Sequence, residues 1–338
     1  MTDQRQQQCE SWVHDQMGAC TFMALPVDAS FRRYFRVKQD NQTWIVMDAP
    51  PEKEDCHPFV AITQLFLQKN VNVPSLVAQD LEQGFLLLTD FGDDLLGRLF
   101  STIQESADRY DEAASVLYRA SIDMLLPIQQ CSTDTLQAFD AGFMQKELDH
   151  FNGWFIEKYL QLDLTPAIKQ TVQTAFKVMI QSAEEQPPVC IHRDYHSRNL
   201  LLTPDNAIGV IDFQDAMSGP ITYDVVSLLR DCYVDWPDEQ VMNWFAYYIE
   251  EAERQGVVEK YDRADWIRWF DLMGVQRHLK AIFIFARKSL RDNDDRYLPD
   301  IRRALYYVNT VLPKYPALAA FTHFMAETVT PLYEDVTV

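Results

Sequence analysis

Residues 191–201 carry side chains of the kinds that phosphoryl transfer requires. The segment reads Ile-His-Arg-Asp-Tyr-His-Ser-Arg-Asn-Leu-Leu, so Asn199 follows Asp194 by five positions, and Asp212 and Phe213 come later between apolar residues. A transferred phosphoryl group needs one carboxylate to meet the attacking hydroxyl and oxygen ligands to hold Mg²⁺ against the phosphates. This spacing is typical of a kinase catalytic loop and its metal-binding aspartate. It predicts Asp194 as the catalytic base and Asn199 and Asp212 as metal ligands.

Neighbouring polar residues are expected to support this loop or to meet a substrate. His192 and Arg193 directly precede the base and are predicted to hold the loop through hydrogen bonds and ion pairs. Asp215 is expected either to support the metal site or to face the substrate. Asp224, at the start of a predicted helix, is expected to cap that helix or to pair with an arginine.

Two kinds of secondary structure are segregated along the chain. Short apolar runs typical of strands fill the first part, and helical spacing of apolar residues dominates from residue 93 onward. This order predicts an α+β fold with a small β-rich nucleotide-binding lobe, residues 1–91, and a larger mainly helical catalytic and substrate-binding lobe, residues 92–338. A nucleotide is expected in the cleft between them. A pair of short strands, 189–191 and 200–202, is predicted to bracket the motif.

The expected elements are strands at 22–26, 34–38, 44–47, 76–78, 84–89 and 208–211, and helices at 3–17, 57–69, 112–130, 143–160, 166–183, 222–232, 239–254, 265–290 and 299–311.

The N-terminal part lacks the usual phosphate-binding signatures. No glycine lies between Gly18 and Gly84, so neither a glycine-rich flap nor a Walker loop is present there. The candidate phosphate-covering turn is 28–33, in which the Ser30 hydroxyl, the backbone N–H groups of Ser30 and Phe31, and an arginine are expected to contact phosphates.

The lysine that kinases carry on the third strand is also missing. The corresponding segment reads Ile45-Val46-Met47-Asp48. Arg33 or Lys53 is the expected substitute. Further along, Leu88 is expected to pack on adenine, and the backbone near Thr89 and Phe91 is expected to hydrogen-bond it.

Composition limits the classes of partner. The 338 residues contain 30 Lys and Arg against 50 Asp and Glu, a net charge of −20, which disfavours binding to nucleic acid or anionic membranes. The six cysteines show no Cys-x-x-Cys spacing, which favours reduced thiols over a zinc or redox site. Neither a secretory signal nor an apolar run of membrane-spanning length is visible. A cytoplasmic protein is expected, and its oligomeric state is left open.

Five blocks of the chain resemble the aminoglycoside-phosphotransferase/choline-kinase superfamily, small-molecule kinases related to protein kinases. The blocks are 30–36, 46–55, 191–202, 210–223 and 274–280. Within the superfamily they look most like a bacterial amino-sugar branch, whose own pattern also lacks the glycine flap and the strand lysine. The resemblance implies a protein-kinase-like bilobal fold.

The same resemblance implies an activity. The protein would use ATP and Mg²⁺ to phosphorylate the anomeric hydroxyl of N-acetylmuramate or N-acetylglucosamine, a step of peptidoglycan recycling. Side chains of the large lobe would bind the sugar, and the lactyl carboxylate of a muramic sugar would favour a cation such as Arg277 or Lys280. The candidate sugar-binding residues are Glu147, His150, Trp154, Asp215 and Arg277.

Two alternatives stay open. An aminoglycoside O-phosphotransferase is one, because its polycationic substrates would suit an acidic chain. The other is a kinase-like binding protein without turnover, which the missing lysine and glycines would permit. Because Asp194, Asn199 and Asp212 are all present, the sequence favours an enzyme.

Overall fold

The computed structural model of the protein describes residues 4–26, 31–105 and 110–337. It consists of two compact units. The first comprises Met1–Leu99 with Arg198–Asp215, and the second comprises Phe100–Ser197 with Ala216–Val338. A strand-rich first unit and a helix-rich second unit confirm the predicted α+β class. The predicted roles of the two lobes, nucleotide binding by residues 1–91 and catalysis with substrate binding by residues 92–338, stay predictions.

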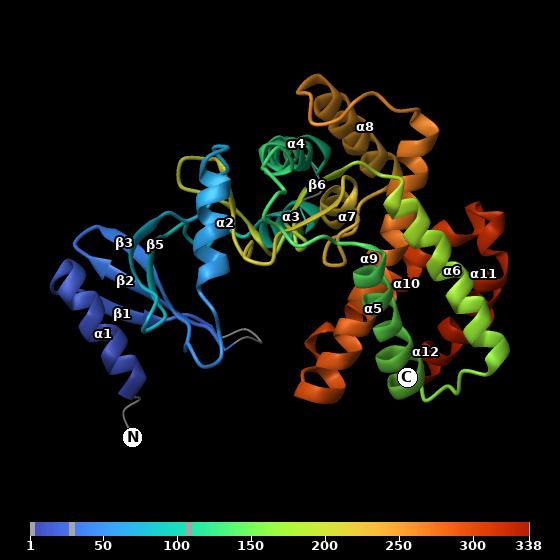
Figure 1. The fold of residues 1–338 in the computed structure, drawn as a ribbon, viewed down its shortest axis with the longest axis horizontal. Helices are drawn as coiled ribbons and strands as arrows, with labels where there is room; N and C mark the ends of the chain where they lie inside the picture. The colour runs from blue at the N-terminus through green and yellow to red at the C-terminus, as the bar shows by residue number, and fades with distance from the viewer. Residues whose placement is uncertain (1–3, 27–30, 106–109, 338) are drawn as a thin grey trace. The chain divides into compact units, whose positions relative to one another are not determined.

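The first unit is built on a five-stranded antiparallel sheet of order β1-β2-β3-β5-β4. Successive side chains along a strand point to opposite faces of the sheet. Alternate apolar residues of β2, β3 and β5 therefore gather on one face. Helix α1 (Gln4–Met17) covers that face, with Trp12 and Val13 packed on Phe35 and Phe85 (Figure 1). The strands are β1 (Thr21–Ala24), β2 (Arg33–Gln39), β3 (Gln42–Asp48), β4 (Leu76–Asp80) and β5 (Phe85–Thr89).

Residues 198–215 belong to the first unit because several contacts tie them to it. Strands β7 (Leu200–Leu202) and β8 (Ile208–Val210) form a hairpin. The N–H of Val210 donates to the Asn72 carbonyl at 2.8 Å. The ring of Phe213 packs against Phe59 and Phe66 of α2 (His57–Leu67), with ring centroids 4.9 and 5.6 Å apart. This apolar contact fixes the segment that carries Asp212.

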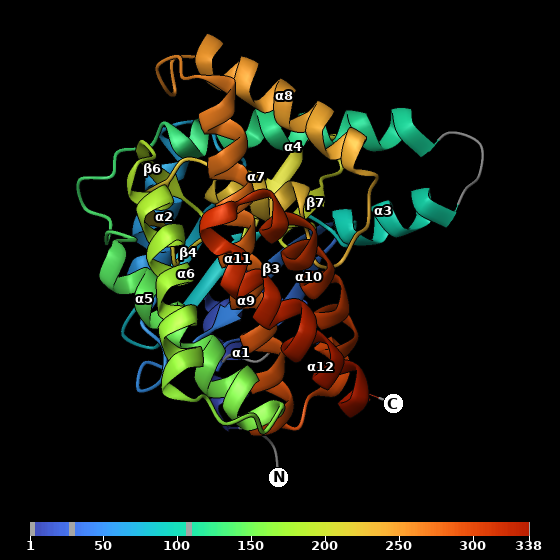
Figure 2. The same cartoon turned by 90° about the vertical axis from the view of Figure 1, so that its right-hand side faces the viewer.

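The second unit is organised around the 30-residue helix α9 (Arg263–Asp292). Its middle turns are buried on every face, and Figure 2 shows it among neighbouring helices that include α6 and α10. The other helices are α4 (Tyr110–Gln129), α5 (Ala141–His150), α6 (Pro166–Glu184), α7 (Tyr223–Leu229), α8 (Asp238–Arg254), α10 (Leu298–Val311), α11 (Ala319–Phe324) and α12 (Thr330–Thr337), and α3 (Leu96–Glu105) leads into this unit.

Shorter helical segments complete the second unit. Asp140 caps α5 by accepting the N–H of Phe143, and at Phe151 the helix widens into the π-helix η1 (Phe151–Tyr159). The helix predicted for 143–160 is therefore present, with its second half in the wider π form. The remaining segments are the 3₁₀-helices η2 (Asp295–Tyr297), η3 (Leu312–Lys314) and η4 (Pro316–Leu318) and the π-helix η5 (Met325–Val329).

The two strands that bracket the motif both form, but they do not pair with each other. Strand β6 (Pro188–Ile191) pairs with β9 (Met217–Pro220), and β7 pairs with β8. The two predicted strands are therefore confirmed, and each pairs with a later strand of its own unit. The end of β6 leads directly into the loop in which Asp194 is the predicted base.

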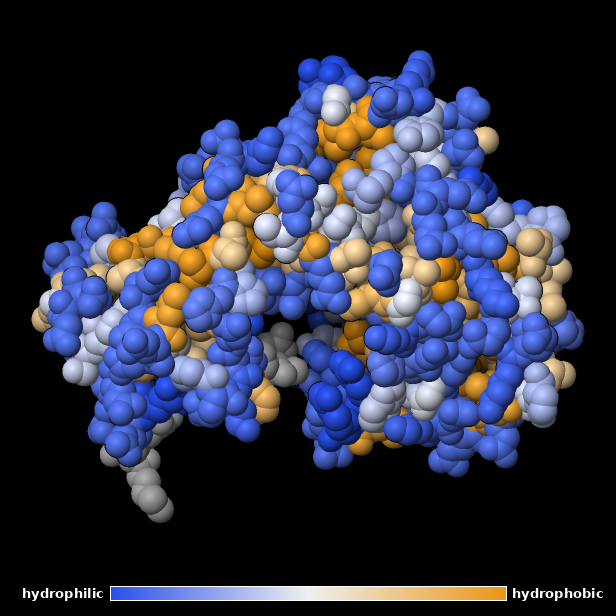
Figure 3. Space-filling model, in the orientation of Figure 1, coloured by the Kyte–Doolittle hydropathy of each residue, from blue (hydrophilic) through white to orange (hydrophobic). Residues whose placement is uncertain are grey.

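One face of the molecule shows how polar and apolar residues are distributed on the surface. The face in Figure 3 is mostly hydrophilic with scattered apolar patches. Among the residues that the structure describes, none of the helices combines the length and the apolar character needed to traverse a bilayer.

Candidate active site

The loop that carries Asp194 is held by a buried carboxylate of α7. Asp224 is fully buried and accepts the backbone N–H groups of His192 and Arg193 at 2.6 and 3.0 Å. Burial raises the pKa of Asp224, and the neighbouring His192 opposes that rise. Arg193 adopts a φ of 80°, and the Asp194 N–H donates to His192 Nδ1 at 3.3 Å. The chain therefore turns sharply after β6 and presents Asp194 at the turn.

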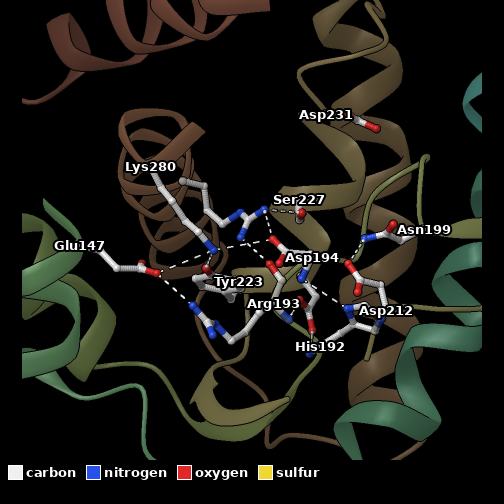
Figure 4. Close-up of polar contacts among 12 residues, drawn as sticks. Glu147, His192, Arg193, Asp194, Asn199, Asp212, Tyr223, Ser227, Asp231 and Lys280 are labelled. Carbon is white, nitrogen blue, oxygen red and sulfur yellow. Dashed lines mark hydrogen bonds and ion pairs between the residues drawn. The ribbon is translucent and has the colours of Figure 1, made fainter. Parts of the chain in front are cut away.

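Two cations of α9 lie beside the Asp194 carboxylate. Lys280 Nζ is 3.6 Å from Oδ1 (Figure 4). Arg277 Nη2 is 3.9 Å from the same oxygen. Lost hydration alone would raise the pKa of Asp194, but Lys280 and Arg277 outweigh it and hold that pKa well below its usual range. The side chain is 41% exposed, whereas that of Lys280 is 8% exposed. Asp194 is thus an ionised carboxylate with its cations on the protein side.

Lys280 also connects Asp194 to a second buried carboxylate. Its Nζ lies 3.7 Å from Glu147 and donates to the Tyr223 hydroxyl at 3.2 Å. Burial would lower the pKa of Lys280, yet the neighbouring carboxylates leave it raised. Glu147 is 8% exposed and also accepts from Arg193 and Gln276, each at 3.1 Å. Glu147 therefore helps to hold the Asp194 loop through Arg193 and Lys280. Its role in sugar binding stays a prediction.

Arg277 likewise contacts the loop backbone. It donates to the Arg193 carbonyl at 2.5 Å and to the Ser227 hydroxyl at 2.7 Å, and its guanidinium stacks on the Tyr223 ring at 4.5 Å. Only 12% of the side chain is exposed. Through these contacts Arg277 holds the backbone of the Asp194 loop against α7. Sugar binding by this residue stays a prediction.

The two predicted metal ligands lie together in the first unit. Asn199 Nδ2 is 3.4 Å from Asp212 Oδ2, and the Ile211 N–H donates to the Asn199 carbonyl at 3.1 Å. Asp212 is exposed, has a φ of 64°, and accepts from Gln214 Nε2 at 3.0 Å. An amide oxygen and a carboxylate are hard ligands, and Mg²⁺ keeps several waters or phosphate oxygens besides such a pair. The residues present therefore fit Mg²⁺.

The base and the metal ligands belong to different units. The boundary falls between Ser197 and Arg198, so the motif begins in the second unit and ends in the first. Each set is ordered by contacts within its own unit. That Asp194, Asn199 and Asp212 act on one phosphate stays a prediction from their spacing.

The predicted sugar residues beyond the loop are spread over three segments. His150 ends α5, is exposed, and has its ring 5.5 Å from the Phe283 ring. Trp154 lies in η1 under the ammonium of Lys158, 3.7 Å from its ring centre. Asp215 is exposed in the first unit, where Gln214 Nε2 lies 3.4 Å from it. His150 and Trp154 belong to the second unit and Asp215 to the first, and a role of these three residues in sugar binding stays a prediction.

The predicted adenine residues lie at the end of β5. Leu88 is buried and paired with Ile45 of β3. The Thr89 hydroxyl accepts the Ser75 N–H at 2.9 Å, and the Thr89 N–H donates to the Ser75 carbonyl. The backbone N–H of Thr89 is therefore already used within the sheet.

A glycine of β8 accommodates the third predicted adenine residue. A Cβ at Gly209 would approach the Phe91 ring to 2.6 Å, so the absent side chain there lets Phe91 lie on the hairpin. Phe91 is thereby tied to the segment that carries Asp212. Its contact with adenine stays a prediction.

The predicted phosphate residues have different surroundings. Ser30 lies outside the described residues. Phe31 is 62% exposed, and the exposed Lys53 places its ammonium 5.4 Å from that ring. Arg33 Nε donates to the fully buried Asp48 at 3.0 Å. Arg33 thus neutralises a buried carboxylate of the sheet.

Comparisons with known proteins agree with this geometry. A family model described as "Phosphotransferase enzyme family" matches residues 21–267. An N-acetylmuramate/N-acetylglucosamine kinase of Pseudomonas putida is 40% identical over 338 residues, covering 96% of this chain and 97% of the relative. A kinase of the same name from Neisseria meningitidis serogroup B is 38% identical over 334 residues, covering 96% of each chain.

Solved structures share the fold at low identity. A Plasmodium vivax ethanolamine kinase superposes with a TM-score of 0.63 at 12% identity, covering 90% of this chain and 85% of its own. The ADP-bound aminoglycoside phosphotransferase APH(2'')-Ib gives 0.59 at 15% identity, covering 89% and 97%. These likenesses confirm the predicted kinase-like architecture.

Proposed function

Because this chain belongs to the phosphotransferase enzyme family, we propose that it transfers the γ-phosphate of ATP to the anomeric hydroxyl of N-acetylmuramate or N-acetylglucosamine. The observation that carries the proposal is the Asp194 carboxylate, half exposed and ionised at the turn after β6. The names of the relatives at 38–40% identity supply the substrate class. Such a product would serve the recycling of cell-wall sugars.

Asp194 is suited to orienting a hydroxyl. A carboxylate whose pKa is held low by Lys280 and Arg277 is a weak base, and it cannot remove a proton early in the reaction. A loose phosphoryl-transfer transition state needs no early removal, because the proton leaves late. An anomeric hydroxyl suits such a base, since it is more acidic than an ordinary alcohol. Asp194 therefore accepts the hydrogen bond of the acceptor hydroxyl and takes its proton when the bond to phosphorus has largely formed.

Asn199 and Asp212 would hold Mg²⁺. Bound there, the ion supplies positive charge that draws the phosphates into line and neutralises charge on the leaving group. The positive φ of Asp212 and the hydrogen bond that the Asn199 amide nitrogen donates to it hold the two side chains next to each other. To bind the ion, the Asn199 amide would turn its oxygen toward it.

The test is a substrate panel with one blocked acceptor. The purified protein is incubated with ATP and Mg²⁺ and either N-acetylmuramate, N-acetylglucosamine, the 1-O-methyl glycoside of N-acetylglucosamine, or kanamycin, and ADP release and the ³¹P spectrum are measured. We expect a sugar 1-phosphate from one or both free sugars and none from the methyl glycoside, whose anomeric oxygen carries no proton. Phosphorylation of kanamycin alone, or equal turnover of the methyl glycoside, would overturn the proposal.

A further inference from the structure

Kinases place a cation on the α- and β-phosphates of the nucleotide, usually a strand lysine paired with a glutamate. This chain has no lysine on β3. Three cations lie close in sequence to the turn and strands expected at the phosphates, namely Arg32, Arg33 and Lys53. The contacts that each of them makes in the first unit show which is best placed to bind phosphate.

Arg33 and Lys53 are poorly placed for this task. Arg33 lies opposite Asp48 in the β2–β3 register and pairs with it, and Asp48 is completely buried. Arg5 also pairs with Asp48, at 2.7 Å, so moving Arg33 to a phosphate would leave a completely buried carboxylate with one of its two cations, which is unfavourable. Lys53 is exposed and lies over the exposed ring of Phe31. Neither of these contacts links the cation to the metal ligand Asp212.

Arg32 has the surroundings that the task requires. Its Nη2 is 3.2 Å from the Glu54 carboxylate, with 13% and 18% of the two side chains exposed. Arg32 directly precedes β2, and its ion pair with Glu54 distinguishes it from Arg33, which pairs with Asp48. The Tyr34 hydroxyl is hydrogen-bonded to Arg32 and lies within electrostatic reach of Asp212.

Burial raises the pKa of Tyr34 to about 12 despite the opposing charge of Arg32, and Asp212 adds to the rise. Arg32, Tyr34 and Asp212 all belong to the same compact unit, and the charge of Asp212 acts on Tyr34. A metal on Asp212 would bring the phosphates to this side of the unit.

We propose that Arg32, oriented by Glu54 and Tyr34, binds the α- and β-phosphates of ATP and takes the place of the missing strand lysine. A guanidinium offers several donors in a plane and matches phosphate oxygens better than an ammonium does. Glu54 is a positioning residue that keeps the guanidinium in place before the nucleotide binds. The inference rests on the proposed ATP-dependent function.

The test measures nucleotide binding without sugar. Isothermal titration calorimetry gives the Kd of ATP, ADP and adenosine, with and without Mg²⁺, for wild type and for the variants Arg32→Met, Arg32→Lys and Glu54→Gln. Charge-assisted hydrogen bonds are worth about 1.5–3 kcal/mol, so Arg32→Met should weaken ATP and ADP about 10- to 100-fold. Adenosine affinity should stay within about twofold, because no phosphate is present to contact Arg32. Arg32→Lys should recover part of the loss, and Glu54→Gln should lose less than Arg32→Met.

Arg98→Met is the matched control, because Arg98 is an exposed arginine of the same unit at the start of α3. It should bind ADP as the wild type does. Equal ADP affinity in wild type and Arg32→Met would overturn the inference. Equal loss of ADP and adenosine in Arg32→Met would also overturn it, since that result indicates a purely structural role. Weaker ADP binding in Lys53→Met but not in Arg32→Met would overturn the inference and indicate that Lys53 is the cation that binds the phosphates.

The same data separate this inference from the proposed function. If Arg32→Met binds ADP more weakly but adenosine as well as the wild type does, and the wild type phosphorylates no sugar, the proposed substrate is overturned and the inference stands. Failure of the wild-type protein to bind Mg-ATP would overturn both.

Discussion

Replacing Lys280 by Met should raise the pKa of Asp194 measurably. The change removes the ammonium 3.6 Å from the carboxylate and keeps most of the side-chain volume in a site that is 8% exposed. Two unit charges at this distance attract by about 1 kcal/mol at the dielectric constant of water and about 4–5 kcal/mol at an effective value of 20. Because 41% of Asp194 is exposed, solvent screening favours the lower part of that range, about 1–2 kcal/mol.

This energy corresponds to an upward shift of about one pKa unit. Arg277 remains 3.9 Å away and keeps part of the depression. The sign follows from the charge. Lys280 favours the ionised carboxylate, so wild-type Asp194 stays ionised below the ordinary pKa of 3.8, and the variant becomes protonated at higher pH. At pH 7 both are ionised, so any lost turnover there reports the position of the carboxylate and not its charge.

The assay is ¹³C NMR of the protein labelled at aspartate Cγ, with the Asp194 resonance identified by its absence in Asp194→Asn. Lys280→Arg should retain the low midpoint because it retains the charge. Lys288→Met is the matched control, since Lys288 lies on the same helix with its ammonium 4.0 Å from the ring of Tyr297. An Asp194 midpoint in Lys280→Met that is equal to the wild-type midpoint would refute the reasoning.

Three further predictions follow from the site and the packing. Asp194→Asn should lower turnover about 10²- to 10⁴-fold with unchanged ADP affinity, measured by single-turnover kinetics and calorimetry; turnover near the wild-type value would exclude Asp194 as the base. Arg230→Met should cost about 1.5–3 kcal/mol in urea denaturation, because the buried Asp271 carboxylate loses its nearest cation, 2.7 Å away, and keeps Lys314 at 3.3 Å and the Tyr315 hydroxyl at 3.0 Å; an unchanged midpoint would contradict that pairing. Gly84→Ala should destabilise more than Gly256→Ala by the same measure. Both sites have positive φ, but only at Gly84 would the new Cβ meet a backbone oxygen, at 1.9 Å. Equal losses of stability in the two variants would show that the backbone around Gly84 shifts to relieve this clash.

The sequence predicted the catalytic loop well because residue type and spacing alone define it. Asp194, Asn199 and Asp212 are chemically specific, and strands β6 and β7 are short apolar runs on either side. Strand β9 was not anticipated, since Met-Ser-Gly-Pro has little strand propensity. Its pairing with β6 depends on tertiary contacts that no local pattern records.

The support of the site was harder to predict. Glu147 and Lys280 are far apart in the chain, and only the packing of α5 against α9 shows that their charges meet. Arg32 and Arg33 are adjacent and identical in type. The register sets Arg33 opposite Asp48, whereas Arg32 pairs with Glu54. Register is a property of the folded sheet, so the sequence alone could not distinguish the surroundings of the two arginines.

The assignment of Arg198–Asp215 to the first unit has a consequence for biosynthesis. A ribosome releases the sheet and α2 long before it makes Phe213, the ring that packs on Phe59 and Phe66. Until residues 100–197 have also been translated, that apolar surface of the nascent chain has no cover, and a holding chaperone would find a binding site there. Truncation after Leu99 should therefore yield an aggregating fragment, whereas a fragment fused to residues 198–215 through a flexible linker should stay in solution.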